Sequence, residues 1–134
     1  EMDITVGPYS HLRSGSHLGK GVNLGNFVEI INSHLGAEVG MTHFGFIGDA
    51  TVGKRARWGA GMITCNLGFD SEEKHRTVIE AGARIGCHTM LVAPVTVGAE
   101  AVTGAGSVVI EDIPPGELAV GVPAQLKGLR RARK

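Results

Sequence analysis

The stretch "TVIEAGARIGCHTMLVAPVTVGAEAVTGAGSVV", residues 77–109, places an aliphatic or β-branched side chain at every sixth position. These positions are Ile79, Ile85, Leu91, Val97, Thr103 and Val109. An amphipathic helix needs apolar residues three and four apart, whereas a six-residue unit fits one short strand followed by one turn. The stretch therefore predicts a repeat of very short strands.

The same period extends upstream through most of the chain. Glycine or another small residue usually follows the aliphatic one, as in "LGNFVE" and "IGCHTM". Three such units close one triangular coil, with the aliphatic side chains inside and small residues at the corners. We predict an all-β, left-handed parallel β-helix of about six coils over residues 1–126, an exception to the right-handed crossover rule. The upstream inward positions are Val6, Leu12, Leu18, Leu24 and Ile30, then Leu35, Met41 and Ile47, then Val52, Trp58 and Thr64.

Two segments depart from the repeat. The stretch "NLGFDSEEKHRT", residues 66–77, is too polar to fill a prism interior, so we expect an extruded loop. Residues 127–134, "KGLRRARK", carry five of the 13 Lys and Arg residues and no acid. We expect a short, solvated basic tail there, and no nucleic-acid partner, because the remainder of the domain is acidic.

The composition indicates one domain. A chain of 134 residues is long enough for one core, and at 4% aromatic residues that core is built from aliphatic side chains. Cys65 and Cys87 are too few for a disulfide framework, and no apolar run approaches ~20 residues. We expect a cytoplasmic protein without a membrane span.

Common catalytic and metal motifs are missing from the sequence. There is no GxxxxGK[ST] phosphate loop and no serine on a nucleophile elbow. No two histidines show tight ligand spacing, and their intervals suggest that most lie at solvent-facing corners. We expect no bound metal. The histidines are His11, His17, His34, His43, His75 and His88.

A single prism has flat faces and no enclosed pocket. Grooves between prisms that pack side by side can hold an extended ligand. We therefore expect a homotrimer whose sites lie between subunits, with loop 66–77 reaching a neighbour.

Several stretches are more specific than the repeat itself, in particular "THFGFIGDATVG", "GAGMITCN" and "LVAPVTVG". With "VGPYSHLRSG", "LGNFVEI" and "TGAGSVV", they make nearly the whole chain resemble one domain of the hexapeptide-repeat transferase superfamily. This is the C-terminal acetyltransferase domain of bacterial bifunctional N-acetylglucosamine-1-phosphate uridyltransferase/glucosamine-1-phosphate acetyltransferase. The resemblance implies acetyl-CoA as co-substrate and an amino sugar phosphate as acceptor. No counterpart of the uridyltransferase half is present in this sequence.

The resemblance also implies roles for individual residues. His43 falls on the catalytic base, and Glu29 on an active-site acid. An imidazole with a pKa near ~6.5 is suited to take a proton from an amine at neutral pH. Without the surrounding motif, His43 would be read as an ordinary corner histidine.

Acceptor and coenzyme residues carry over in the same way. Arg13 matches an arginine that holds the sugar phosphate, and Asn66 and Lys74 match residues that line the site. Phe46 and Arg57 fall at two further acceptor positions. Backbone groups that bind the pantetheine arm are implied at Ala60, Cys87 and Ala105, where a need for small corner residues is the plain alternative.

Three positions depart from the family pattern. Ile31 stands where a lysine is usual, Phe46 where a tyrosine is usual, and Arg57 where an asparagine is usual. The first two departures remove a cation and a hydroxyl from the acceptor pocket, which lowers affinity for phosphates and hydroxyls. Arg57 is a candidate replacement for the cation lost at Ile31.

The leading hypothesis is an acetyl-CoA-dependent N-acetyltransferase for a glucosamine-1-phosphate-like acceptor, in the synthesis of UDP-N-acetylglucosamine for the cell envelope. The alternatives are a non-catalytic trimerisation or regulatory module and, less favoured, a zinc-dependent γ-type carbonic anhydrase relative.

Overall fold

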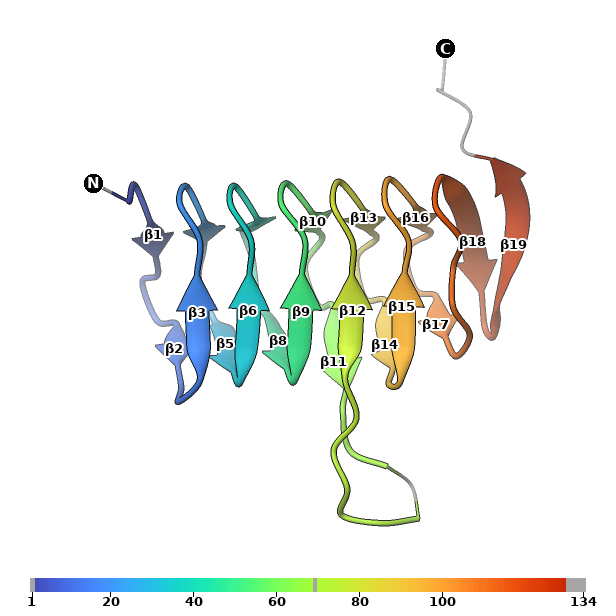
Figure 1. Ribbon diagram of the computed structural model, residues 1–134, viewed down its shortest axis with the longest axis horizontal. Coiled ribbons are helices and arrows are strands. Elements are labelled where there is room, and N and C mark those ends of the chain that lie inside the picture. The colour runs from blue at the N-terminus through green and yellow to red at the C-terminus, as the bar shows by residue number, and fades with distance from the viewer. Residues whose placement is uncertain (1, 69, 130–134) are drawn as a thin grey trace.

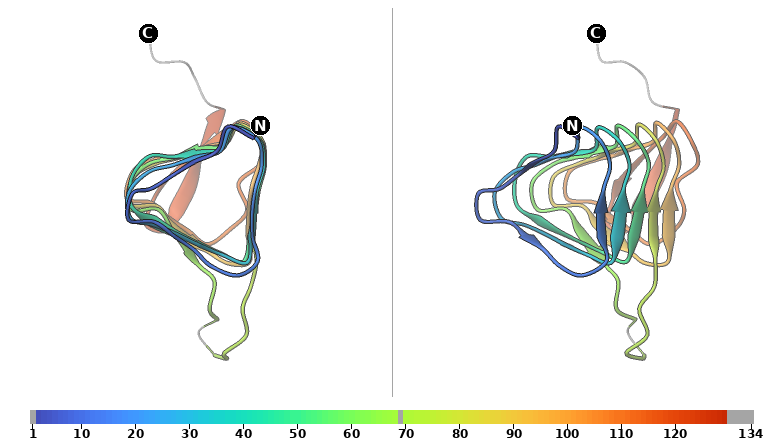
Figure 2. Two further views of the ribbon diagram at one scale, coloured as in Figure 1. Left: turned by 90° about the vertical axis from the view of Figure 1, so that its left-hand side faces the viewer. Right: turned by 60° about the vertical axis from the view of Figure 1, so that its left-hand side comes forward.

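A computed structural model describes residues 2–68 and 70–129 and shows a triangular rod of short β-strands (Figure 1). The described residues contain strands and turns, and no helix among them is long and apolar enough to cross a membrane. Three sheets form the sides of the triangle when the rod is viewed along its axis (Figure 2). We call them sheets A, B and C in the order in which the chain visits them.

From β1 to β17, successive strands of the chain belong to the three sheets in turn, so strands that are neighbours in space are three elements apart in the chain. Sheet A contains β1 (Thr5–Val6), β4 (Asn23–Leu24), β7 (Gly40–Met41), β10 (Arg57–Trp58), β13 (Arg84–Ile85), β16 (Val102–Thr103), β18 (Glu117–Gly121) and β19 (Ala124–Leu129). Sheet B contains β2 (His11–Leu12), β5 (Val28–Ile31), β8 (Gly45–Gly48), β11 (Ile63–Cys65), β14 (Met90–Val92) and β17 (Val108–Val109). Sheet C contains β3 (Ser16–Leu18), β6 (Ser33–Leu35), β9 (Ala50–Val52), β12 (Thr77–Ile79) and β15 (Val95–Val97).

The coil is left-handed, as predicted. In Figure 1 the chain rises along sheet C at the front, returns behind along sheets A and B, and advances to the right. Neighbouring strands pair in parallel, for example β10 with both β7 and β13. The exception is β18, which pairs antiparallel with β19 and closes the C-terminal end of the rod.

The core follows the six-residue period. Leu24, Ile30, Met41, Ile47 and Leu91 are fully buried at predicted inward positions, and the bulky Trp58 is 5% exposed. The small residues four places after the aliphatic ones also point inward, because the chain turns at each corner. Those buried this way include Val22, Val28, Ala83, Val95, Ala101 and Ser107.

The first coil is less well covered than the others. Val6 and Leu12 lie at predicted inward positions but are 39% and 40% exposed. No coil stacks on their N-terminal side within the described residues, so these side chains contact the core from one side only.

The predicted loop 66–77 leaves the rod at the corner between sheets B and C, between β11 and β12 (Figure 1). Its last residue, Thr77, is buried and is already the first residue of β12. An antiparallel bridge between Leu67 and Lys74 holds its two arms together. At the other end of the chain, β19 continues to Leu129, so the first part of segment 127–134 is strand. Residues 130–134 lie outside the described residues.

The expectation that most histidines lie at corners is wrong. His11, His17 and His34 lie on strands, because each directly precedes an inward leucine and therefore points outward from the sheet. His17 and His34 stack on sheet C with ring centroids 4.3 Å apart. His43 and His88 do lie at a corner, and His75 lies in the loop.

Candidate active site

The corner between sheets A and B carries four of the predicted site residues in one row. The strands that lead into this corner are in register, with Trp58 beside both Met41 and Ile85. Because each row member follows its inward strand residue by two positions, the four occupy equivalent places in four successive coils. They are His43, Ala60, Cys87 and Ala105.

The backbone of this row suits a ligand that carries amide groups. The carbonyls of Ala60 and Cys87 accept hydrogen bonds of 2.8 Å from the next coil. The N–H groups of Ala60, Cys87 and Ala105 donate to no other group of the described residues. Successive coils are about 4.8 Å apart, so these free donors form a line parallel to the rod axis. The row thus fits the backbone contacts implied for the pantetheine arm.

Aromatic rings flank this row. The Phe44 ring lies edge-on to His88, with centroids 5.8 Å apart. Gly61, which lies between them in the fold, makes this contact possible, because a methyl group there would come within 2.6 Å of the His88 ring. Toward the N-terminal end, the rings of Tyr9 and Phe27 stack with their centroids 5.6 Å apart. These two side chains are 77% and 64% exposed.

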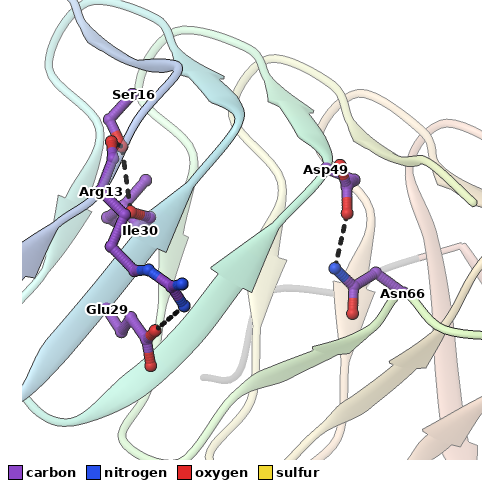
Figure 3. A network of polar contacts seen from close by, with 6 residues as sticks. All are labelled: Arg13, Ser16, Glu29, Ile30, Asp49 and Asn66. Carbon is purple, nitrogen blue, oxygen red and sulfur yellow. Dashed lines mark hydrogen bonds and ion pairs between the residues drawn. The ribbon is translucent and has the colours of Figure 1, made fainter. Parts of the chain in front are cut away.

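The outer face of sheet B carries Arg13, which was predicted to hold the acceptor phosphate, and Glu29, which was predicted to be an active-site acid. Arg13 Nη1 lies 2.8 Å from Glu29 Oε1, and both side chains are partly exposed (Figure 3). The Ser16 hydroxyl donates to the Arg13 carbonyl at 2.7 Å, which fixes the backbone beside the guanidinium. Glu29 is in register with Phe46 on the next strand. Arg13, Glu29 and Phe46 therefore form a continuous strip across three coils.

Asn66 extends this strip by one more coil. A methyl group at Gly48 would lie 2.6 Å from Asn66 Nδ2 and 2.7 Å from Phe46 Cζ, so the two side chains converge over this glycine. The amide of Asn66 donates to Asp49 Oδ2 at 2.6 Å (Figure 3), and that of Asn32 donates to Asp49 Oδ1 at 2.6 Å. Asp49 is 7% exposed. It is a positioning residue that the sequence analysis did not single out, although it lies within the specific "GDA" stretch.

Two predicted acceptor residues lie away from this strip. Lys74 is exposed on loop 66–77, whose base is tied to the site by a 2.7 Å hydrogen bond from the His75 N–H to the Asn66 carbonyl. Arg57 lies on sheet A, so within one chain it is on a different face from Arg13 and Glu29. Ile31 is in register with Gly48 and faces outward on sheet B, beside the strip.

In residues 2–68 and 70–129, no three His, Cys, Asp or Glu side chains are grouped so that they could hold a metal ion. Both cysteines are free thiols, and burial raises the pKa of the Cys65 thiol above its ordinary value.

Two proteins named bifunctional protein GlmU are similar to this chain over nearly its whole length. The one from Polaromonas naphthalenivorans (strain CJ2) is 49% identical over 128 residues, which make up 96% of this chain and 27% of that protein. The one from Paracoccus denitrificans (strain Pd 1222) is 55% identical over 124 residues, 91% of this chain and 27% of that protein. The chain is a homologue of the GlmU acetyltransferase domain.

The resemblance deduced from the sequence motifs is confirmed by this homology. The chain spans about a quarter of the length of the curated GlmU proteins it matches. No family model matches it. The GlmU relationship therefore concerns the β-helix, and the activity of the whole protein is taken up below as a proposal.

Solved structures agree with the fold. The acetyltransferase domain of PglB from Neisseria gonorrhoeae FA1090, in complex with acetyl coenzyme A, has a TM-score of 0.83 at 21% identity and covers 94% of this chain and 58% of that chain. PerB from Caulobacter crescentus, in complex with CoA and GDP-perosamine, has a TM-score of 0.56 at 27% identity. The match to PerB covers 92% of this chain and 58% of that chain.

Proposed function

We propose that the chain is an acetyl-CoA-dependent N-acetyltransferase that acts on a glucosamine-1-phosphate-like amino sugar in the synthesis of UDP-N-acetylglucosamine. The observation that carries the proposal is the row at the A–B corner. There His43 matches the family's catalytic base. In the next three coils, the N–H groups of Ala60, Cys87 and Ala105 have no hydrogen-bond acceptor among the described residues. Homology to GlmU and the PerB complex with CoA support it.

In this proposal His43 is the general base. An ammonium has no lone pair, so the amine must lose a proton before or as its nitrogen attacks. His43 is exposed at the head of the row and is free to accept that proton. When bound, acetyl-CoA would supply the thioester carbonyl that the amine nitrogen attacks. As the C–N bond forms and the C–S bond breaks, coenzyme A would leave as a thiol that takes up the proton held by His43. The N–H groups of Ala60, Cys87 and Ala105 hold the coenzyme arm.

The strip on sheet B binds the acceptor. Arg13 presents a planar guanidinium suited to phosphate, and a phosphate entering the site competes with Glu29 for it. Asn66 and Phe46 line the sugar, with Asn66 oriented by Asp49. Lys74 approaches from the loop. Glu29, as the active-site acid, is held by Arg13 until the phosphate arrives.

We further propose that the enzyme is a homotrimer. The outer face of sheet B presents a column of partly buried apolar side chains, a surface that soluble monomers seldom leave uncovered. A neighbouring prism on this face would cover the column and supply the second wall that a flat sheet lacks. The column consists of Phe46, Ile63, Met90 and Val108, with Cys65 and Val92 beside it. A cytoplasmic location, expected from the two free thiols, belongs to the same proposal.

One observation favours the non-catalytic alternative. Ile31 and Phe46 place apolar groups at two positions of the acceptor face where the family pattern has a cation and a hydroxyl. A trimerisation or regulatory module that had lost acceptor binding would show this pattern and would still keep the coenzyme row.

An acceptor screen tests the proposal. The protein is incubated with acetyl-CoA and a panel of amino sugars with and without phosphate, and release of free thiol is followed. We expect turnover with at least one amino sugar phosphate. Binding of coenzyme A without turnover on any amino sugar would overturn the enzymatic proposal and favour the non-catalytic module.

A further inference from the structure

Two arginines on sheet A lie side by side without an acidic partner. Arg57 in β10 and Arg84 in β13 are register partners on adjacent parallel strands, and both are exposed. Like charges placed directly opposite each other destabilise a sheet. The only ion pair found in the described part of the chain joins Arg13 to Glu29 on another sheet. The fold itself therefore gains nothing from this pair.

The surroundings of the two arginines suit an anion. No carboxylate occupies an outward position of sheet A from β1 to β16 within the described residues. These positions are Thr5, Asn23, Gly40, Arg57, Arg84 and Val102. A dianion placed here would meet two arginine side chains whose strands are about 4.8 Å apart at the backbone, and no acid at the outward positions of this sheet.

The position of Arg57 links this site to His43. A methyl group at Gly40 would lie 2.8 Å from Arg57 Nη1, so the guanidinium lies over Gly40 in the preceding coil. Gly40 is followed within three residues by His43. At no more than about 3.6 Å per residue, the backbone under the guanidinium is within roughly 11 Å of His43.

We propose that Arg57 and Arg84 form one anion site that, together with Arg13 of a neighbouring subunit in the proposed trimer, binds the phosphate group of the acceptor. That the phosphate belongs to the acceptor rests on the proposed function. Arg57 was already a candidate acceptor residue, and Arg84 is the residue that the structure adds. The two arginines supply the positive charge that is lost where Ile31 replaces the family's usual lysine. Coenzyme A is the other source of phosphate, because Arg57 and Arg84 lie in the same coils as Ala60 and Cys87 of its proposed row. Steady-state kinetics distinguish the two sources.

Phosphate binding can be measured without any acetyl transfer. Isothermal titration with inorganic phosphate and with pyrophosphate, at fixed ionic strength, compares the native chain with R57Q, R84Q and the double variant. Lys54→Gln is the matched control, because it removes an exposed cation from the same coil as Arg57, at the corner between sheets C and A. We expect each arginine substitution to weaken binding about tenfold, as loss of one charge-assisted contact does, and Lys54→Gln to leave it within about twofold. Native affinity in R84Q would overturn the proposal.

Steady-state kinetics then identify the source of the phosphate. We expect R84Q to raise KM for glucosamine 1-phosphate about tenfold while KM for unphosphorylated glucosamine and for acetyl-CoA stays within about twofold. A rise confined to acetyl-CoA would overturn the assignment to the acceptor. If no amino sugar is acetylated while phosphate binding still depends on both arginines, the proposed function fails and the anion site stands.

Discussion

At the scale of single residues, His43 differs from the five other histidines in where it lies. His11, His17 and His34 point outward from strand faces, His75 lies in the loop, and His88 packs against Phe44. His43 alone stands at the head of the row with free backbone donors. Its place in the fold, and not its residue type, distinguishes it from the others.

Replacing His43 by alanine tests this role. We expect kcat to fall by about 10² to 10⁴, the usual effect of losing a general base, with KM for acetyl-CoA little changed. His34→Ala is the control, because His34 is exposed on sheet C, away from the row. Turnover of the His43 variant within a few-fold of native would make His43 an ordinary corner residue.

The departures at Ile31 and Phe46 give a second prediction. Each lost hydrogen bond to a charged group costs roughly 1.5–3 kcal/mol, so the native chain should act on glucosamine 1-phosphate with kcat/KM lowered by about 10² to 10⁴. The double change Ile31→Lys with Phe46→Tyr restores both groups on the strip beside Asn66, and we expect kcat/KM to rise. Arg57→Asn in the native background shows whether Arg57 offsets part of the loss.

The comparison is kcat/KM for native and variant chains on glucosamine 1-phosphate, with other amino sugars alongside. A native chain as efficient as ordinary GlmU proteins would contradict this prediction. It would mean that the three positions matter less than the family pattern suggests.

At the scale of the elements, loop 66–77 is the part of the chain that the repeat does not hold in place. Its base is fixed by Asp49, whose two carboxylate oxygens accept from Asn32 and Asn66, and by the backbone bond between His75 and Asn66. Asp49 adopts a φ of 51°, a left-handed conformation that aspartate and asparagine tolerate better than most residues. One buried carboxylate thus ties together three successive coils at the B–C corner.

We expect Asp49→Asn to lower the free energy of unfolding by about 1.5–3 kcal/mol. The substitution keeps the size and the backbone preference of the side chain but leaves one amide donor facing another. Urea denaturation provides the measurement. Glu72→Gln, an exposed loop acid, serves as the control and should change stability by no more than about 0.5 kcal/mol. A loss below that limit for Asp49→Asn would mean that the network contributes little.

At the scale of the whole molecule, the three faces of the rod differ. Sheet A presents the two arginines, sheet C presents the stacked pair His17 and His34, and sheet B presents the apolar column. Every side chain on these faces points outward from a strand, so it contributes little to the core of its own chain. We therefore attribute the differences between the faces to their partners, which we propose to be an anion on sheet A and a neighbouring subunit on sheet B.

Association through sheet B gives the last prediction. We expect light scattering to report a trimer at micromolar concentration and Val92→Lys to shift it toward monomer, because the ammonium would be buried in the interface. Val78→Lys is the matched control, since Val78 is also an outward, partly buried valine but lies on sheet C. A native monomer, or a Val92→Lys trimer as stable as the native one, would contradict association through this face.

The sequence by itself determined the coil. A six-residue period fixes which side chains point inward, so the core positions Leu24, Ile47 and Leu91 and the break at residues 66–77 could be predicted. The same period aligned His43 with Ala60, Cys87 and Ala105, although their roles came from the family resemblance. Such positions repeat along the chain, and a local pattern is enough to find them.

Only the tertiary structure decided which outward side chains meet. Arg57 is the direct neighbour of both Gly40 and Arg84 on sheet A. Gly40 is 17 residues away in the chain, whereas Arg84 is 27 residues away because the extruded loop lengthens the coil between them. The bonds from Asn32 and Asn66 to Asp49, and the antiparallel closure by β18 and β19, likewise depend on stacking between coils. Contacts across coils arise from the hydrogen bonds between parallel strands, and the six-residue period alone does not say which outward side chains those bonds bring together.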